Sequence, residues 1–135
     1  MKAVIVGPII ALAMSWGVGT SVAASLADEV KVEMDSSAVH PGMEPGKYIC
    51  GAGHLHIKGT VQNLSAAAVG PVKVAGTVFD ANGKVLDTAT GSTRQAVLNP
   101  NDKATVDLEF LKVTGPLIKQ VKKEELAVVA VAPKQ

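Results

Sequence analysis

The sequence is poor in aromatic side chains and in cysteine. Its 135 residues include two phenylalanines, one tyrosine and one tryptophan, which leaves few surfaces on which the bases of a single-stranded nucleic acid could stack. Cys50 is the only cysteine, so no disulfide can form within the chain. These shortages argue against a single-stranded nucleic-acid binder and against a scaffold held together by internal disulfides.

An excess of charge of either sign is also missing. Thirteen lysines and arginines stand against twelve aspartates and glutamates, and one of the lysines, Lys2, precedes an apolar N-terminal stretch. The signs are interspersed, as where Lys122 and Lys123 are followed directly by Glu124 and Glu125. A balanced surface does not attract phosphate backbones or anionic lipids. We therefore expect no nucleic-acid partner, and contact with a membrane only through the N-terminal stretch.

Sequence motifs of known catalytic chemistries are absent as well. The chain has no P-loop, no glycine pattern of a dinucleotide site, no serine-centred nucleophile elbow and no C-x-x-C-H motif for haem. Asp107 and Glu109 are expected on the outward face of a strand, where alternating charges keep a sheet soluble and protect its edges. We expect a protein that is not an enzyme.

The N-terminal stretch from Ala3 to Ala27 carries no charge. A basic residue, an apolar run and then small residues are typical of a secretory signal, with cleavage after Ala24 or after Ala27. The alternative is a retained anchor helix, because a stretch of this length can span the roughly 30 Å of a bilayer's hydrocarbon. We expect residues 1–27 to be a signal peptide or a membrane anchor and residues 28–135 to form an exported domain, periplasmic or extracellular.

The remainder of the chain alternates apolar and polar side chains in short runs separated by turn residues. A period of two is typical of a strand with one buried face. In residues 55–62 it places Leu55, Ile57 and Val61 on the buried face. The predicted strands are residues 28–34, 48–50, 55–62, 72–79, 84–88, 95–98, 105–110 and 126–131. Residues 117–123 are ambiguous.

Asn82-Gly83 is the strongest turn signal, since both residues tolerate the positive φ that a type I′ hairpin turn needs. Asp80, just before it, is expected to bond backbone amides of the turn rather than calcium, because the rest of an EF-hand loop is missing. Seven or eight strands separated by such turns predict an all-β fold, an antiparallel sandwich of two sheets that follows an N-terminal hydrophobic helix.

Three segments of the chain resemble the FxLYD family. They are G-x-V-x-N-x-S in residues 59–65, V-x-V-x-G-T-V-F-D-x-x-G-K-V-L in residues 72–86, and L-x-P in residues 98–100. The resemblance covers about residues 54–111. Members of this family are immunoglobulin-like domains of exported prokaryotic proteins with no common enzymatic activity. The resemblance therefore implies an immunoglobulin-like sandwich and an exported protein, and it implies no active site.

One departure from the FxLYD pattern concerns the core. The leading phenylalanine of the family corresponds to Gly76, and its Leu-Tyr-Asp corresponds to Val78, Phe79 and Asp80. The missing aromatic ring predicts either a gap in the core or room for a neighbouring side chain.

His54 and His56 are the sharpest chemical feature. Residues two apart on a strand point the same way and lie about 6.5–7 Å apart, so both imidazoles could bind one metal ion at about 2.0–2.1 Å. The alternative is a pair of exposed histidines on a solvated face. Lys58 follows on the same face, and its charge would repel a cation.

Cys50 lies four residues before His54. In an extended chain about 13 Å would separate the two residues, which is too far for a shared ion. A bend at residues 51–53 would close this distance, and the glycines at 51 and 53 permit one. The plainer alternative is a small buried thiol.

The sequence thus supports two predictions of function. The first is a non-catalytic binding or assembly module that docks on another envelope protein or membrane complex, or on itself, through its strand edges and the loop 36–47. The second is a periplasmic copper or zinc protein that uses His54, His56 and Cys50. His40, Met43 and Met34 are further ligands close in sequence.

Overall fold

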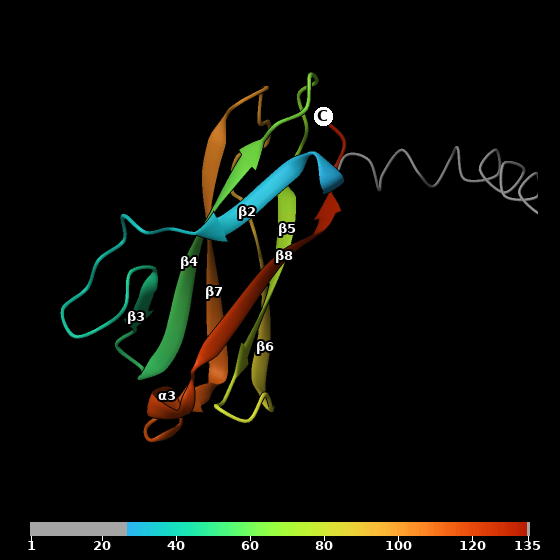
Figure 1. Cartoon of the computed structure of the whole chain (residues 1–135). Helices are drawn as coiled ribbons and strands as arrows, with labels where there is room; N and C mark the ends of the chain where they lie inside the picture. Colours follow the sequence, from blue (N-terminus) through green and yellow to red (C-terminus); the bar gives the residue numbers. More distant parts are fainter. Residues whose placement is uncertain (1–26, 135) are drawn as a thin grey trace, which may run out of the picture.

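The structure, a computed structural model, describes residues 27–134 (Figure 1). The predicted signal peptide or anchor helix, and the cleavage points within it, lie outside these residues apart from Ala27. Among the described residues, no helix is both long and apolar enough to cross a membrane.

Seven antiparallel strands and one short helix make up the described chain. They are β2 (Val30–Met34), β3 (Lys47–Ile49), β4 (His54–Asn63), β5 (Val72–Phe79), β6 (Val85–Ser92), β7 (Lys103–Thr114), α3 (Leu117–Gln120) and β8 (Lys123–Val131). The mostly β, antiparallel fold confirms the prediction at this level. The ambiguous residues 117–123 form α3 and the connection into β8.

Strand β4 is the centre of the first sheet. One edge of β4 pairs with β2 over residues 59–63 and with β3 over residues 55–57. The other edge of β4 pairs with β7. The second sheet has the order β6-β5-β8. The two sheets pack as a sandwich (Figure 1).

The core lies between the sheets and follows the period of two. Every second side chain of β4, β5 and β7 is buried. The core side chains include Leu55, Ile57, Val61, Val72, Val74, Val78, Val106, Leu108 and Phe110, each at most 3% exposed. The inward sets predicted for these strands are therefore confirmed.

Gly76 of β5 makes room for neighbouring side chains rather than leaving a gap. A Cβ at this position would lie 2.6 Å from Leu108 Cδ1 and 3.2 Å from Phe110 Cζ. Leu126 of β8 approaches the same point, with Cδ2 at 3.1 Å. Side chains from β7 and β8 thus occupy the volume that an aromatic ring would need.

Asn63 joins the first sheet to the chain beyond β6. Its buried side-chain amide donates to the carbonyls of Ala67 and Leu98, and its carbonyl oxygen accepts from Ser65. The predicted strand over residues 95–98 is wrong, because only Leu98 makes a ladder contact there, an isolated bridge to Val69. The chain leaves the sheet after β6, where Thr93 closes onto the backbone of Val72.

The hairpin between β5 and β6 is present, but its turn is not type I′. Gly83 has a φ of +82°, whereas Asn82 is not among the residues with positive φ. The Gly83 amide bonds the Asp80 carbonyl, so the loop is a three-residue type I turn that ends in a left-handed glycine. The Asp80 carboxylate accepts from the amides of Asn82 and Lys84. This confirms the predicted role of Asp80. The same two bonds stabilise the three-residue loop in place of the predicted two-residue turn.

Candidate metal centre

The outward face of the first sheet gathers the chemically active side chains. His54 and His56 project outward from β4. Sheet register places Tyr48 of β3 beside His56 on one side and Glu109 of β7 beside it on the other. Asp107 lies one row further along β7, opposite Lys58. Residues more than fifty positions apart in sequence are therefore neighbours across strands.

A tight turn brings Cys50 to the same place. The Cys50 amide bonds the His54 carbonyl at 3.0 Å, and the Gly53 amide bonds the Cys50 carbonyl at 2.9 Å. Gly53 has a φ of +89°, a conformation that glycine adopts at little cost. The structure therefore contains the bend at residues 51–53 that a shared site would need. It brings the Cys50 Sγ to 3.9 Å from His54 Nδ1.

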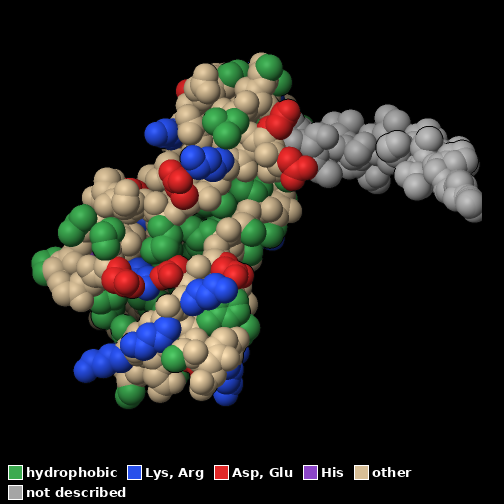
Figure 2. All heavy atoms as spheres, in the orientation of Figure 1, with side chains coloured by type: hydrophobic (Ala, Val, Ile, Leu, Met, Phe, Trp, Pro, Cys, Tyr) green, Lys and Arg blue, Asp and Glu red, His purple; other side chains and the backbone are tan. Residues whose placement is uncertain are grey.

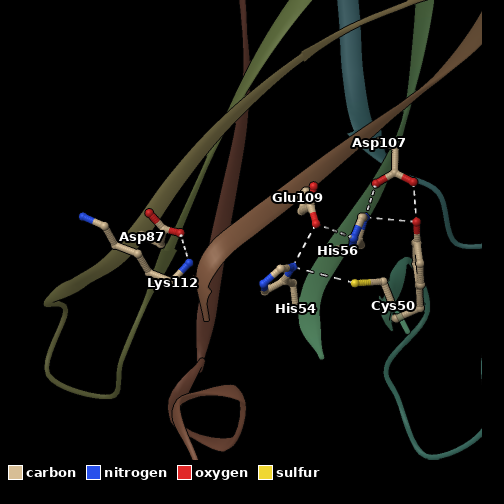
Figure 3. Close-up of polar contacts among 8 residues, drawn as sticks. Cys50, His54, His56, Asp87, Asp107, Glu109 and Lys112 are labelled. Carbon is tan, nitrogen blue, oxygen red and sulfur yellow. Dashed lines mark hydrogen bonds and ion pairs between the residues drawn. The ribbon is translucent and has the colours of Figure 1, made fainter. Parts of the chain in front are cut away.

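His56 is oriented by a carboxylate. Its Nδ1 lies 2.7 Å from Asp107 Oδ1, and the Tyr48 hydroxyl donates to the other Asp107 oxygen (Figure 3). A carboxylate only accepts, so in the neutral ring Nδ1 carries the hydrogen and Nε2 presents a lone pair. That Nε2 is buried, has no hydrogen-bond partner among residues 27–134, and lies 3.6 Å from Glu109 Oε2.

Cys50, His56 and Glu109 each offer one ligand atom, and these atoms lie within 4.8 Å of one another. Zinc takes sulfur at about 2.3 Å and nitrogen or oxygen at about 2.0–2.2 Å. Ligand atoms on one ion are therefore roughly 3–4 Å apart. His56 Nε2 and Glu109 Oε2, 3.6 Å apart, already have this spacing.

His54 adjoins this set without being one of its three members. Its Nδ1 lies 2.9 Å from Glu109 Oε2 and faces the Cys50 sulfur (Figure 3). The structure thus groups the predicted residues Cys50 and His56 with Glu109 and places His54 beside them. The sequence alone predicts a solubilising charge at Glu109, and the register opposite His56 is what places it in this group.

An aromatic stack covers His56. The Tyr48 ring stacks on both His40 and His56, with centroids 5.0 Å and 4.6 Å away. His56 is therefore only 13% exposed, so the outward orientation predicted for both imidazoles is right but full exposure to solvent is not. The Lys58 ammonium lies over the Tyr48 ring, 5.6 Å from its centroid. Met34 and Met43 pack against the core instead.

Hydrogen bonds adjust the protonation of these groups. A hydrogen bond from the backbone of His54 is the largest influence on the Cys50 thiol and lowers its pKa. Partial burial raises this pKa and His56 lowers it further, so the net value is about 7. Burial lowers the pKa of His56, but the neighbouring Asp107 carboxylate and Cys50 thiol outweigh burial, so the pKa is raised. Burial and the bond to Asp107 raise the pKa of Tyr48. Cys50 is half-buried, so it is not the inert buried thiol of the plainer alternative.

No family model matches the chain, and no curated protein matches it in sequence. Among solved structures, IrmA from Escherichia coli is similar with a TM-score of 0.50 and 11% identity over 78% of this chain and 77% of that one. A DUF1425 family member from Shewanella sp. pv-4 has a TM-score of 0.43 and 18% identity over 74% and 76%.

These likenesses bear on the fold alone. The match to IrmA is consistent with a small two-sheet β-sandwich, and the TM-score of the second match is too low to argue from. The class that the fold and the side-chain cluster define is thus a small antiparallel β-sandwich with a thiol, imidazole and carboxylate group on one outward face. The finer resemblance to the FxLYD family stays a prediction.

Proposed function

We propose that this protein is an exported β-sandwich, of the FxLYD immunoglobulin-like type, that binds a transition-metal ion, zinc or copper, through Cys50, His56 and Glu109. One observation carries the proposal: the buried Nε2 of His56 has no partner in the described chain and faces a carboxylate beside a thiol. An unpartnered buried nitrogen is costly, and a bound cation would satisfy it.

The donor set supports a borderline or soft ion. Thiolate and imidazole prefer zinc and copper, whereas magnesium and calcium prefer oxygen alone. The bond from His56 Nδ1 to Asp107 is the arrangement by which a carboxylate fixes the tautomer and orientation of a metal-binding histidine. With the thiol pKa near 7, a large fraction of Cys50 is already thiolate at neutral pH. His54 is placed to become a fourth ligand.

Isothermal titration of the purified protein with Zn²⁺ and with Cu⁺ tests this proposal. We expect one ion per chain, and a loss of affinity of at least about tenfold in each of Cys50→Ser, His56→Gln and Glu109→Gln. Glu125→Gln, an exposed glutamate on β8 of the other sheet, is the matched control and keeps the native affinity. Equal affinity in the native protein and the His54→Ala/His56→Ala double variant would contradict the proposal.

A binding or assembly role remains the second candidate, and β8 favours it. This nine-residue strand pairs with β5 along one edge, and no strand between residues 27 and 134 pairs with its other edge. Val129 on it is 51% exposed. A long unpaired edge is a template for strand addition from another chain. Light scattering after size exclusion tests self-assembly, and a dimer that Val129→Lys dissociates would support it. A protein that runs as a monomer and with which no envelope protein co-purifies would oppose the binding or assembly role.

A further inference from the structure

A cleft of about 390 Å³ lies apart from the metal cluster, between the loop that precedes β3 and the segment around α3. Its apolar wall is formed by Met43, Leu55, Ile118 and Val121. Leu55 belongs to the core and is 1% exposed, and the other three pack against that core. The cleft therefore reaches from solvent to the hydrophobic interior.

The charged wall of this cleft is predominantly positive. Lys47, Lys119 and Lys122 line it together with a single acid, Glu44. The Lys47 side chain is only 6% exposed and is held between Glu44 and Glu124. Lys119 and Lys122 are exposed, and neither forms an ion pair within the described part of the chain. Figure 2 shows positive side chains gathered over the region of α3 and the start of β8.

We propose that this cleft binds a fatty carboxylate of medium chain length. The apolar tail would lie against Leu55, Ile118 and Val121, and the carboxylate would pair with the ammonium groups of Lys119 and Lys122. Charge complementarity selects an anion, because three lysines and a single glutamate line the cleft and neither exposed lysine forms an ion pair within residues 27–134. The volume is at the low end of the range for small-molecule sites, roughly 300–1,000 Å³, which suits one chain of about ten carbons and not a two-chain lipid.

Buried Lys47 forms part of the cleft wall and is not the group that binds the carboxylate of the ligand. Its two glutamates already neutralise it, so a ligand need not displace either of them. The pair with Glu44 is local, whereas the pair with Glu124 joins the first residue of β3 to β8.

Titration calorimetry with decanoate on the metal-free full-length protein tests the proposal. We expect saturable binding of one decanoate per chain, and an affinity lower by about tenfold or more in Lys119→Ala/Lys122→Ala. The matched control is Lys73→Ala/Lys84→Ala, two exposed lysines outside the cleft, which keeps the native affinity. The cationic analogue decyltrimethylammonium is not expected to bind.

Methyl NMR locates the ligand without any mutation. Decanoate is expected to shift the methyl signals of Ile118 and Leu55 and to leave those of Val129 on β8 unchanged. The proposal is overturned by an absence of saturable binding, by equal binding in both double variants, by equal binding of the cationic analogue, or by shifts at Val129 of the same size as at Ile118.

Discussion

The two faces of β4 follow the same alternation but differ in what the sequence says about them. The inward face carries Leu55, Ile57 and Val61, which are at most 1% exposed, and the alternation alone identifies them. The outward face carries His54 and His56, whose roles depend on partners in β3 and β7. Burial can thus be inferred from the sequence of one strand, whereas recognising a binding site requires knowing how the three strands β3, β4 and β7 are aligned.

The inward face should govern stability. Ile57→Ala is expected to lower the free energy of unfolding by about 2–5 kcal/mol, because it removes a fully buried side chain and leaves a cavity. Thr60→Ala, on the outward face of the same strand, is expected to cost less than about 1 kcal/mol. Denaturation in urea measures both values, and equal losses would mean that the two faces do not differ in this way.

The outward face should govern ligand affinity. Asp107→Asn removes the carboxylate that orients His56, so we expect metal affinity to fall by about 10–100-fold. The change in unfolding free energy should stay below about 1 kcal/mol, since Asp107 is 43% exposed. Calorimetry and denaturation are done on the same sample. A loss of stability without a loss of affinity would assign Asp107 a structural role only.

The thiol on the outward face should be unusually reactive. Because the pKa of Cys50 is lowered to about 7 from 9.0, alkylation by iodoacetamide should reach half its maximal rate near pH 7. In His56→Gln the midpoint should rise but stay below 9.0, since the backbone of His54 is the larger cause. Mass spectrometry of the labelled protein gives the rate at each pH, and a native midpoint near 9.0 would contradict the structure.

Lys47 is the charged exception among inward residues, opposite Ile57 in the register. Burial lowers its pKa, but the bonds to Glu124 and Glu44 outweigh burial, so the pKa is raised above 10.5. A raised pKa adds stability that is fully present below 10.5 and is lost as pH rises through the higher folded value. Unfolding at pH 9 and pH 12 should show a small loss, absent in Lys47→Met. The same loss in both proteins would assign it to other groups.

Much of the fold could be predicted because it depends on local signals. The period of two gave the inward sets of β4, β5 and β7, and Asn82-Gly83 marked a hairpin. The turn type was missed because the Asp80 carboxylate stabilises a longer loop. The strand at residues 95–98 was wrong because Thr93 and Asn63 take the chain out of the sheet through contacts 21 and 35 residues away in sequence.

The candidate site was predicted only where its residues are close in sequence. Cys50, His54 and His56 lie within one hairpin, so spacing and a glycine turn suggested them. Glu109 and Asp107 lie on β7, where a carboxylate on an outward face looks like any other solubilising charge. Their position beside His56 follows from a cross-strand register that a single sequence does not contain.

Cobalt substitution tests the central claim most directly. If Cys50, His56 and Glu109 hold one ion, adding Co²⁺ to the native protein will produce a thiolate-to-cobalt charge-transfer absorption that saturates at one ion per chain and disappears in Cys50→Ser and in Glu109→Gln. An absorption that Glu109→Gln leaves unchanged, or none in the native protein, would contradict the account.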